Sequence, residues 1–333
     1  MFDIKDLAGA SEPLKRLIEV VAEGVGGISR PLLTRKNADA KAYEIKTIAQ
    51  AIVDSQKLLG TVKYQEGSII IDSSSDKEMK YLPDPNTDQR VLARTTYQQA
   101  KKQSNIEHVI QQTVDELKSE QDVSPDKPDS DWVTRFFSIT EDISTDHMQI
   151  IWGKILAGEI KKPGSYSLRT LELLKNINQR EAELFVRVGK IAIWSGGKVF
   201  IPNTDNGIYL QEKFKLSFSD FLTLREIGLL VPNDLEISLP LAEEDDHTVF
   251  SSGNTAIIIN RLKGTPRQAL TCIMFTENGK QLLQLIEKSP ADLDYIKRFA
   301  SIWRREVVEI QSGIIVEKEN GKFALENLQE IPT

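Results

Sequence analysis

The stretch MQIIWGKILAGEIKKPGSYSLRTLELLKNI, residues 148–177, carries the strongest pattern in this chain. Its apolar side chains recur every three or four residues as far as Ile160, as they do on the buried face of a helix. Pro163 and Gly164 then end that helix, and apolar residues from Leu168 onward predict another. The stretch therefore predicts a helical hairpin with a sharp corner.

Two glycines, Gly153 and Gly158, stand inside the first helix of this hairpin. Each costs about 1 kcal/mol relative to alanine in a helix interior, so a compensating contact is expected. Close approach of a second helix, with Trp152 covering the gap, would supply that contact. Arg169 can reach back across the corner to Glu159 or to the carbonyls that end the first helix. These features favour a rigid helical corner and a contact surface over an active site.

On both sides of the hairpin the apolar spacing is mostly helical until about residue 195, after which short strand-like runs become common. The fold class predicted is mainly α with an α+β part: an N-terminal and central helical bundle or hairpins, followed by a winged-helix-like C-terminal domain. The predicted parts are N-terminal amphipathic helices (1–60), a linker (61–87), a long polar helix (88–121), a central helical hairpin (131–180), a winged-helix-like α+β domain (181–290), and a C-terminal helix and tail (291–333).

The C-terminal prediction depends on two short segments. REIGLLVPN, which begins at Arg225, resembles the helix end of a winged-helix module, and FTENGKQLL, which begins at Phe275, resembles the segment that follows its sheet. The resemblance covers about residues 180–288. It implies a small sheet packed on helices, and such modules serve either as DNA readers or as packing units.

A DNA-reading module would use the predicted helix at residues 214–227, with Lys213, Lys215 and Arg225 available as nucleic-acid contacts. Phosphate neutralisation usually needs several cations, and each base contact needs a placed side chain. Three cations are a small set. DNA binding is therefore an alternative and not the main interpretation.

The composition and charge of the chain limit the classes of protein to which it can belong. The chain has 333 residues, of which 40% are hydrophobic and 27% charged, so it can bury a sizeable core. A net charge of −7 gives no overall attraction to nucleic acid or anionic lipid. One cysteine excludes a disulfide within the chain, and no apolar run approaches the length of a spanning helix. We expect a soluble, cytoplasmic protein.

The residues usual in catalysis form no recognisable site. The histidines His108, His147 and His247 lack the four-residue spacing that puts two metal ligands on one helix face. One acidic cluster lies at a helix start, where the helix dipole favours acidic side chains, and the other lies in AEEDDH, which is expected to be a solvated loop. Gly-rich GVGGIS lacks the strand and spacing of a phosphate-binding turn, and Cys272 lies in an apolar run. We assign no catalytic, cofactor-binding or metal-binding residue, and no cofactor or small-molecule substrate.

The central stretch also carries a family resemblance. An acidic EDIS turn, a Trp-Gly-x-x-Leu-Ala-Gly-Glu helix, Pro-Gly-Ser and a Ser-x-Arg-Thr-Leu helix resemble the signature of a bacterial family known only as a domain of unknown function. A looser similarity links the chain to alpha-type abortive-infection proteins, which stop phage growth. The resemblance supplies no catalytic residue, and the signature residues that we expect to form an interaction surface are Trp152, Gly153, Leu156, Gly158, Glu159, Gly164, Ser165 and Arg169.

These observations predict a non-enzymatic bacterial interaction or regulatory protein, with phage defence implied by the looser resemblance. A protein partner or a homo-oligomer is expected. The alternatives are a winged-helix DNA-binding regulator, an enzyme of unknown reaction, and an effector that acts on membranes through residues 14–33. Lys15, Arg16, Arg30 and an apolar face favour a lipid surface there, but Glu19 and Glu23 argue against it.

Overall fold

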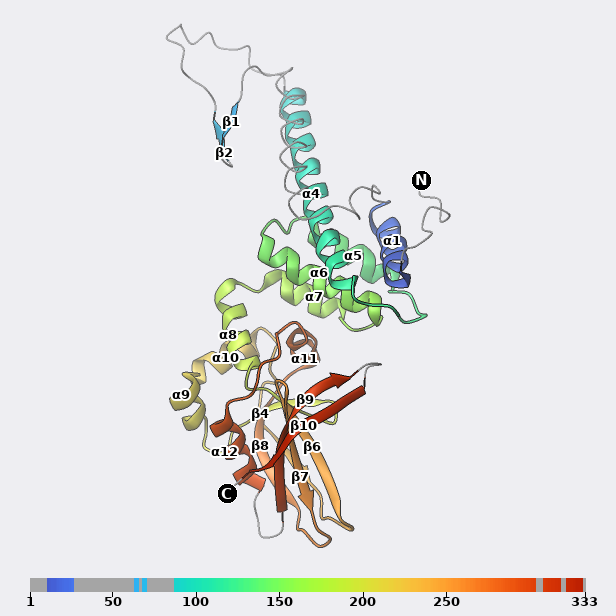
Figure 1. Cartoon of the computed structure of the whole chain (residues 1–333). Helices are drawn as coiled ribbons and strands as arrows, with labels where there is room; N and C mark the ends of the chain where they lie inside the picture. The colour runs from blue at the N-terminus through green and yellow to red at the C-terminus, as the bar shows by residue number, and fades with distance from the viewer. Residues whose placement is uncertain are drawn as a thin grey trace. The chain divides into compact units, whose positions relative to one another are not determined.

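The computed structural model (Figure 1) describes residues 11–26, 63–65, 68–70, 87–303, 308–318 and 322–331. The chain divides into two compact units, Met1–Leu168 and Arg169–Thr333. The helix expected at about 37–59 lies outside the described residues. The elements of the first unit are α1 (Glu12–Val25), a short hairpin of β1 (Lys63–Gln65) and β2 (Ser68–Ile70), α4 (Thr87–Leu117), α5 (Ser130–Thr140) and α6 (Asp146–Lys161).

Aromatic residues of α5 and α6 form the core of the first unit. Asp129 caps α5 by accepting a hydrogen bond from the backbone N–H of Trp132 at 2.9 Å, which fixes where the helix begins. Trp132 stacks on Phe136 with ring centroids 5.1 Å apart, and Phe136 meets Trp152 of α6 edge-on at 5.6 Å. The Trp132 indole N–H also donates to the Tyr166 carbonyl, so its polar atom is paired.

The apolar face of α1 is buried against α5. Leu17 and Val21 are fully buried, and a Cβ placed on Gly24 would lie 2.1 Å from the Phe137 ring. A membrane-active helix needs that face free to enter lipid. As far as residue 26, the apolar face considered for a lipid surface therefore forms part of the protein's own core, and residues 27–33 of that segment lie outside the described residues. No helix among the described residues is long and apolar enough to cross a membrane.

The long helix α4 is buried at one end only. Val109, Ile110, Val114 and Leu117 are almost completely buried, and they pack mainly on α6. Leu92 and Tyr97, in the other half, are 61% and 49% exposed. Figure 1 shows that half extending beyond the other helices of the unit. The polar composition of the segment fits this, because few side chains there need burial.

The second unit contains α7 (Leu168–Asn176), which starts at the unit boundary, and a large sheet with helices around it. The other helices are α8 (Gln179–Gly189), α9 (Ile208–Phe214), α10 (Phe218–Glu226), α11 (Glu277–Leu283) and α12 (Leu293–Trp303). The strands are β3 (Ile193–Ser195), β4 (Lys198–Pro202), β5 (Leu235–Leu239), β6 (Asp246–Ser252), β7 (Thr255–Arg261), β8 (Gln268–Met274), β9 (Val308–Lys318) and β10 (Lys322–Glu330).

The prediction of a mainly α fold with a winged-helix-like C-terminal domain is wrong. The strands form one eight-stranded sheet, in the order β10-β9-β7-β6-β3-β4-β8-β5, and each neighbouring pair is antiparallel. A winged helix has only a small sheet. Here the tail hairpin β9–β10 adds to β7, with Thr255 opposite Ile314, so the tail that follows the expected C-terminal helix contributes two strands to the sheet. About half of the residues that the structure describes are helical.

Helix α12 covers the part of the sheet that carries the aromatic core. Phe299 and Trp303 of α12 contact Phe250 of β6, with ring centroids 5.1 and 5.6 Å apart. Phe200 of β4 joins them at 6.2 Å from Phe250. The Gln268 side chain of β8 donates to the Trp303 carbonyl, which ties the end of the helix to the sheet. Burial of these large rings stabilises this unit.

Candidate functional site

Trp152 and Gly153 lie where α6 approaches α4. Trp152 is fully buried, and a Cβ placed on Gly153 would lie 2.5 Å from the Cβ of Gln112. The Thr113 hydroxyl donates to the Gly153 carbonyl at 3.3 Å, across the same contact. A glycine is thus needed for the two helices to come this close. Leu156, on the same helix, is also fully buried.

Gly158 has a different neighbour. A Cβ there would lie 2.8 Å from the ring of Tyr166, which follows the Pro-Gly-Ser corner. Gly158 therefore makes room for an aromatic side chain of the corner and not for a second helix. The Tyr166 ring is 4% exposed, and burial raises the pKa of its hydroxyl to about 12.

Glu159 holds the corner together. Its carboxylate accepts hydrogen bonds from the backbone N–H of Gly164 at 2.6 Å and of Tyr166 at 3.1 Å. Gly164 has φ of +83°, a conformation that glycine adopts readily, and the Ser165 hydroxyl donates to the Lys162 carbonyl. Arg169 is exposed and belongs to the second unit. The hydrogen-bond donors to the Glu159 carboxylate are thus backbone amides of the corner, and a contact of Arg169 with Glu159 or with the carbonyls that end α6 stays a prediction.

Burial raises the pKa of Glu159, and the backbone hydrogen bonds of the turn oppose that shift. A buried carboxylate with a raised pKa can mark a catalytic acid. This one is 2% exposed and satisfied by its own turn, so its chemistry is structural. Whether the signature residues also form an interaction surface stays a prediction.

The three cations considered for nucleic acid have partners within the second unit. Lys213 pairs with Asp292 and Asp294 at 3.2 and 3.0 Å, which raises its pKa. Lys215 ends α9 in the left-handed conformation, with its amine donating to the Glu212 carbonyl. The third, Arg225, forms an ion pair with Asp234, which lies on the loop between α10 and β5.

The predicted helix at 214–227 is also divided. Phe214 ends α9, and Ser217 begins α10 through a capping box with Asp220, in which each side chain bonds the other residue's backbone N–H. The sequence SFSD carries this signal. The turn between the two helices is what creates a pocket beside them.

This pocket has a volume of about 280 Å³ and lies between the two helices and the sheet. Its lining residues are Asn203, Asn206, Gly207, Gln211, Leu216, Phe218, Phe221, Arg225, Pro232, Asn233, Asp234 and Ile273. At its polar side, the Asn203 amide N–H donates to Asp234 at 2.6 Å, and Arg225 pairs with the other oxygen of that carboxylate. Of these three residues, only Arg225 was predicted from the sequence to make contacts. Asn203 and Asp234 lie in the Asn- and Pro-containing turns IPNTDNG and VPND, whose composition was the only local indication of a site.

Apolar side chains are exposed beside the same pocket. Phe218 is 71% and Leu222 46% exposed, and they lie one turn apart on α10. Ile208, which follows the pocket residue Gly207, is 58% exposed. Exposed large apolar groups next to a concavity are typical of binding surfaces. We call Ile208, Phe218 and Leu222 the α10 patch.

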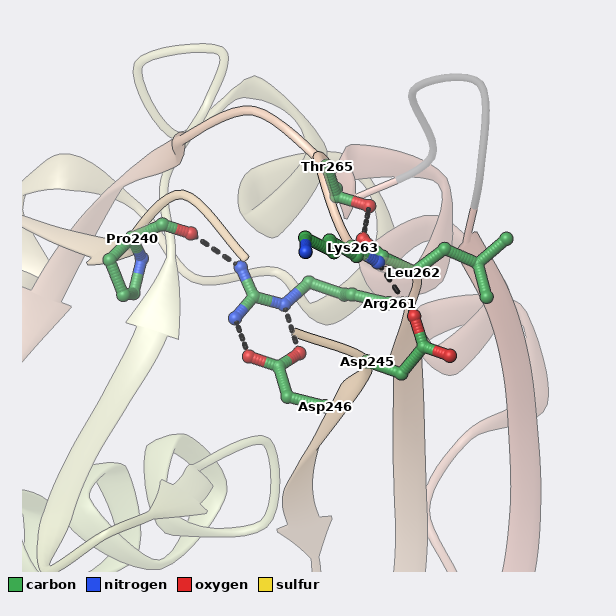
Figure 2. Close-up of polar contacts among 7 residues, drawn as sticks. All are labelled: Pro240, Asp245, Asp246, Arg261, Leu262, Lys263 and Thr265. Carbon is green, nitrogen blue, oxygen red and sulfur yellow. Dashed lines mark hydrogen bonds and ion pairs between the residues drawn. The ribbon is translucent and has the colours of Figure 1, made fainter. Parts of the chain in front are cut away.

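A second concavity, of about 630 Å³, is lined by residues of β6 and β7, and several of its polar groups bond to one another or to backbone atoms of the protein. Arg261 is 3% exposed, and its guanidinium forms a two-point ion pair with Asp246 and donates to the Pro240 carbonyl at 2.6 Å (Figure 2). Asp245 accepts from the backbone N–H of Lys263 (Figure 2). Within the described residues, no group of histidine, cysteine and acidic side chains is arranged to hold a metal ion.

Comparison with known proteins places the chain in a family. Searches of curated proteins and of solved structures found no match. A family model described as "Protein of unknown function (DUF2806)" matches residues 89–300, which is more than half of the chain. The match includes the Trp-Gly-x-x-Leu-Ala-Gly-Glu helix and the pocket, and it confirms the expectation of a family of unknown function. The chain therefore belongs to the DUF2806 family.

Proposed function

We propose that this protein is a non-enzymatic interaction protein with a regulatory role, which binds a partner protein through the α10 patch. The observation that carries the proposal is the exposure of Phe218, 71%, at the mouth of the pocket. Burying such a ring on a partner removes apolar surface from water, and aromatic anchors beside pockets dominate many interfaces.

Physical chemistry of the surroundings supports binding over catalysis. Arg225 and Asp234, the charged residues of the pocket lining, neutralise each other. General acid–base catalysis needs a group free to exchange a proton at the operating pH. A phage-defence role stays a prediction from the looser resemblance.

The test uses a photo-crosslinking amino acid incorporated at Leu222 in cells that carry the native gene. We expect a specific crosslinked product, and we expect Phe218→Ser to abolish it. The matched control is the same amino acid at Leu293, which is 68% exposed on α12 and does not line the pocket. Equal products from both positions, or none from Leu222, would contradict the proposal.

The mass of the product identifies the kind of partner. A product of twice the chain mass indicates a second copy, and sedimentation of the purified protein should then show a dimer that Phe218→Ser dissociates. Any other mass indicates a different protein. Because Phe218 is mostly exposed, its replacement should change the free energy of unfolding by no more than about 0.5 kcal/mol.

A further inference from the structure

The pocket beside α10 contains two buried polar atoms that lack a hydrogen-bond partner. They are the side-chain oxygen Oδ1 of Asn203 and the Nε–H of Arg225. A buried donor or acceptor left unpaired costs about 1–3 kcal/mol, so proteins rarely keep one without reason. The acceptor and the donor belong to two residues, Asn203 and Arg225, that both line the same cavity. Neither is exposed to bulk water, so solvent at the surface does not satisfy them.

Asp234 determines which atoms of Asn203 and Arg225 remain without a hydrogen-bond partner. Its two oxygens accept from the Asn203 amide nitrogen and from the Arg225 terminal nitrogen. Turning the Asn203 amide over would place its oxygen against the carboxylate, which is repulsive. The Asn203 oxygen therefore stays an acceptor directed away from Asp234, and the Arg225 Nε–H stays a donor. Because one carboxylate holds both side chains, the two unpaired atoms belong to neighbouring groups.

Charge and shape narrow the class of ligand. Arg225 and Asp234 cancel, so an anion finds no net positive charge and a cation no net negative charge. Leu216, Phe221 and Ile273 are almost fully buried and form apolar walls. A volume of about 280 Å³ is at the low end for ligand pockets, so it suits a small flat group carried by something larger.

We propose that this pocket receives a neutral carboxamide, the side chain of an asparagine or glutamine of the partner, whose N–H donates to Asn203 Oδ1 and whose oxygen accepts from Arg225 Nε. This inference rests on the proposed function, since the α10 patch surrounds the pocket mouth. The carboxamide has one donor edge and one acceptor edge on a flat, uncharged group, which is the complement of the two unpaired atoms.

The test uses three probes of equal shape and different charge: benzamide, benzoate and benzamidine, titrated into the full-length protein and followed by saturation-transfer NMR. We expect benzamide to bind about tenfold more tightly than either charged probe. Equal binding of the three, tighter binding of a charged probe, or no benzamide binding up to about 10 mM would overturn the inference, since small ligands rarely bind more weakly in a matched pocket.

Two substitutions in the pocket test whether benzamide binds there and not elsewhere on the protein. Arg225→Lys keeps the positive charge and removes the Nε–H, so benzamide affinity should fall about tenfold. Arg267→Lys is the matched control, because Arg267 pairs with Glu236 at 2.6 Å on the same sheet and is 61% exposed. If Arg225→Lys fails to fold, Phe218→Ser at the pocket mouth should still weaken benzamide binding. Unchanged affinity in that variant would place the probe elsewhere and overturn the inference.

The two proposals fail separately. Crosslinking from Leu222 that Phe218→Ser abolishes, together with no benzamide binding, would leave the interaction surface standing and remove the carboxamide. Benzamide binding without a crosslinked product would remove the partner and leave the chemistry of the pocket.

Discussion

Gly153 of α6 faces Gln112 of α4 so closely that a Cβ on the glycine would lie 2.5 Å from the Cβ of the glutamine. Backbone atoms of Gln112 and Thr113 lie 3.1 Å from the same position, so rotating a side chain cannot relieve the clash. The separation of the two helices is therefore set by the missing side chain. Several consequences of this and other contacts can be measured.

Gly153→Ala should destabilise the protein although alanine favours helices. Forcing a methyl group into a packed contact costs about 1–3 kcal/mol, which exceeds the gain of about 1 kcal/mol in helix propensity when the helices cannot separate. Chemical denaturation gives the free energy of unfolding. Lys154→Ala, one residue along α6, is the control and should stay near the wild type. An increase in stability for Gly153→Ala would show that α4 and α6 move apart easily.

Glu159→Gln should destabilise the Pro-Gly-Ser corner by about 1–2 kcal/mol, because an amide cannot accept from the backbone N–H groups of both Gly164 and Tyr166. The cost should depend on pH. Burial raises the folded-state pKa of Glu159 above 4.5, so between pH 4.5 and that pKa the folded protein binds a proton that the unfolded chain has lost. The contribution of the Glu159 carboxyl to the free energy of unfolding is therefore fully present below pH 4.5 and falls as the pH rises through the folded-state pKa. Denaturation of both proteins across that range measures this, and a difference that grows with pH would refute it.

Asp246→Asn should destabilise the second unit by about 3–5 kcal/mol, because it leaves the buried guanidinium of Arg261 without its carboxylate. Glu236→Gln is the control. It breaks the ion pair with Arg267, whose side chains are 61% and 55% exposed, and such pairs contribute about 0–1 kcal/mol. Similar losses in the two variants would mean that water reaches Arg261.

Cys272 should not react with thiol reagents in the folded protein. It is fully buried, its thiol contacts the Leu235 carbonyl at 3.4 Å, and burial raises its pKa to about 11. Reaction needs the thiolate, so labelling at about pH 8 should be slow until the protein unfolds. The labelling rate measured against denaturant concentration tests this. Rapid labelling without denaturant would show that β5 opens from β8.

The helices were largely predictable because their signals are local. Asp129 begins α5 and Ser217 begins α10, and each cap bonds an N–H three residues away, although the single helix predicted at 214–227 overlooked the second of these starts. Gly153 could be identified as a close approach because a glycine inside an apolar helix needs compensation. Its partner, Gln112, could not, since nothing near position 153 encodes the register of another helix.

The sheet could not be predicted because its pairings join distant segments. Thr255 of β7 lies opposite Ile314 of β9, and Phe200 of β4 lies opposite Met274 of β8, which follows it by more than seventy residues. Short apolar strands next to a Gly-Leu-Leu helix end fit a small wing equally well at the level of sequence. The candidate site was missed for the same reason, because Asn203, Arg225 and Asp234 meet only after β4, α10 and the loop before β5 have come together.

The order of strands has a consequence for how the protein is made. Strand β7, with its apolar run TAIIINR, leaves the ribosome about fifty residues before β9, which pairs with it. Throughout that interval one side of β7 has no neighbour, and an unpaired apolar edge invites association with other chains. Translation halted before residue 308 would leave that edge open permanently. The β9–β10 hairpin thus covers the open edge of β7 and completes the sheet. We expect nascent chains to be most prone to aggregate in the interval before this hairpin is synthesised.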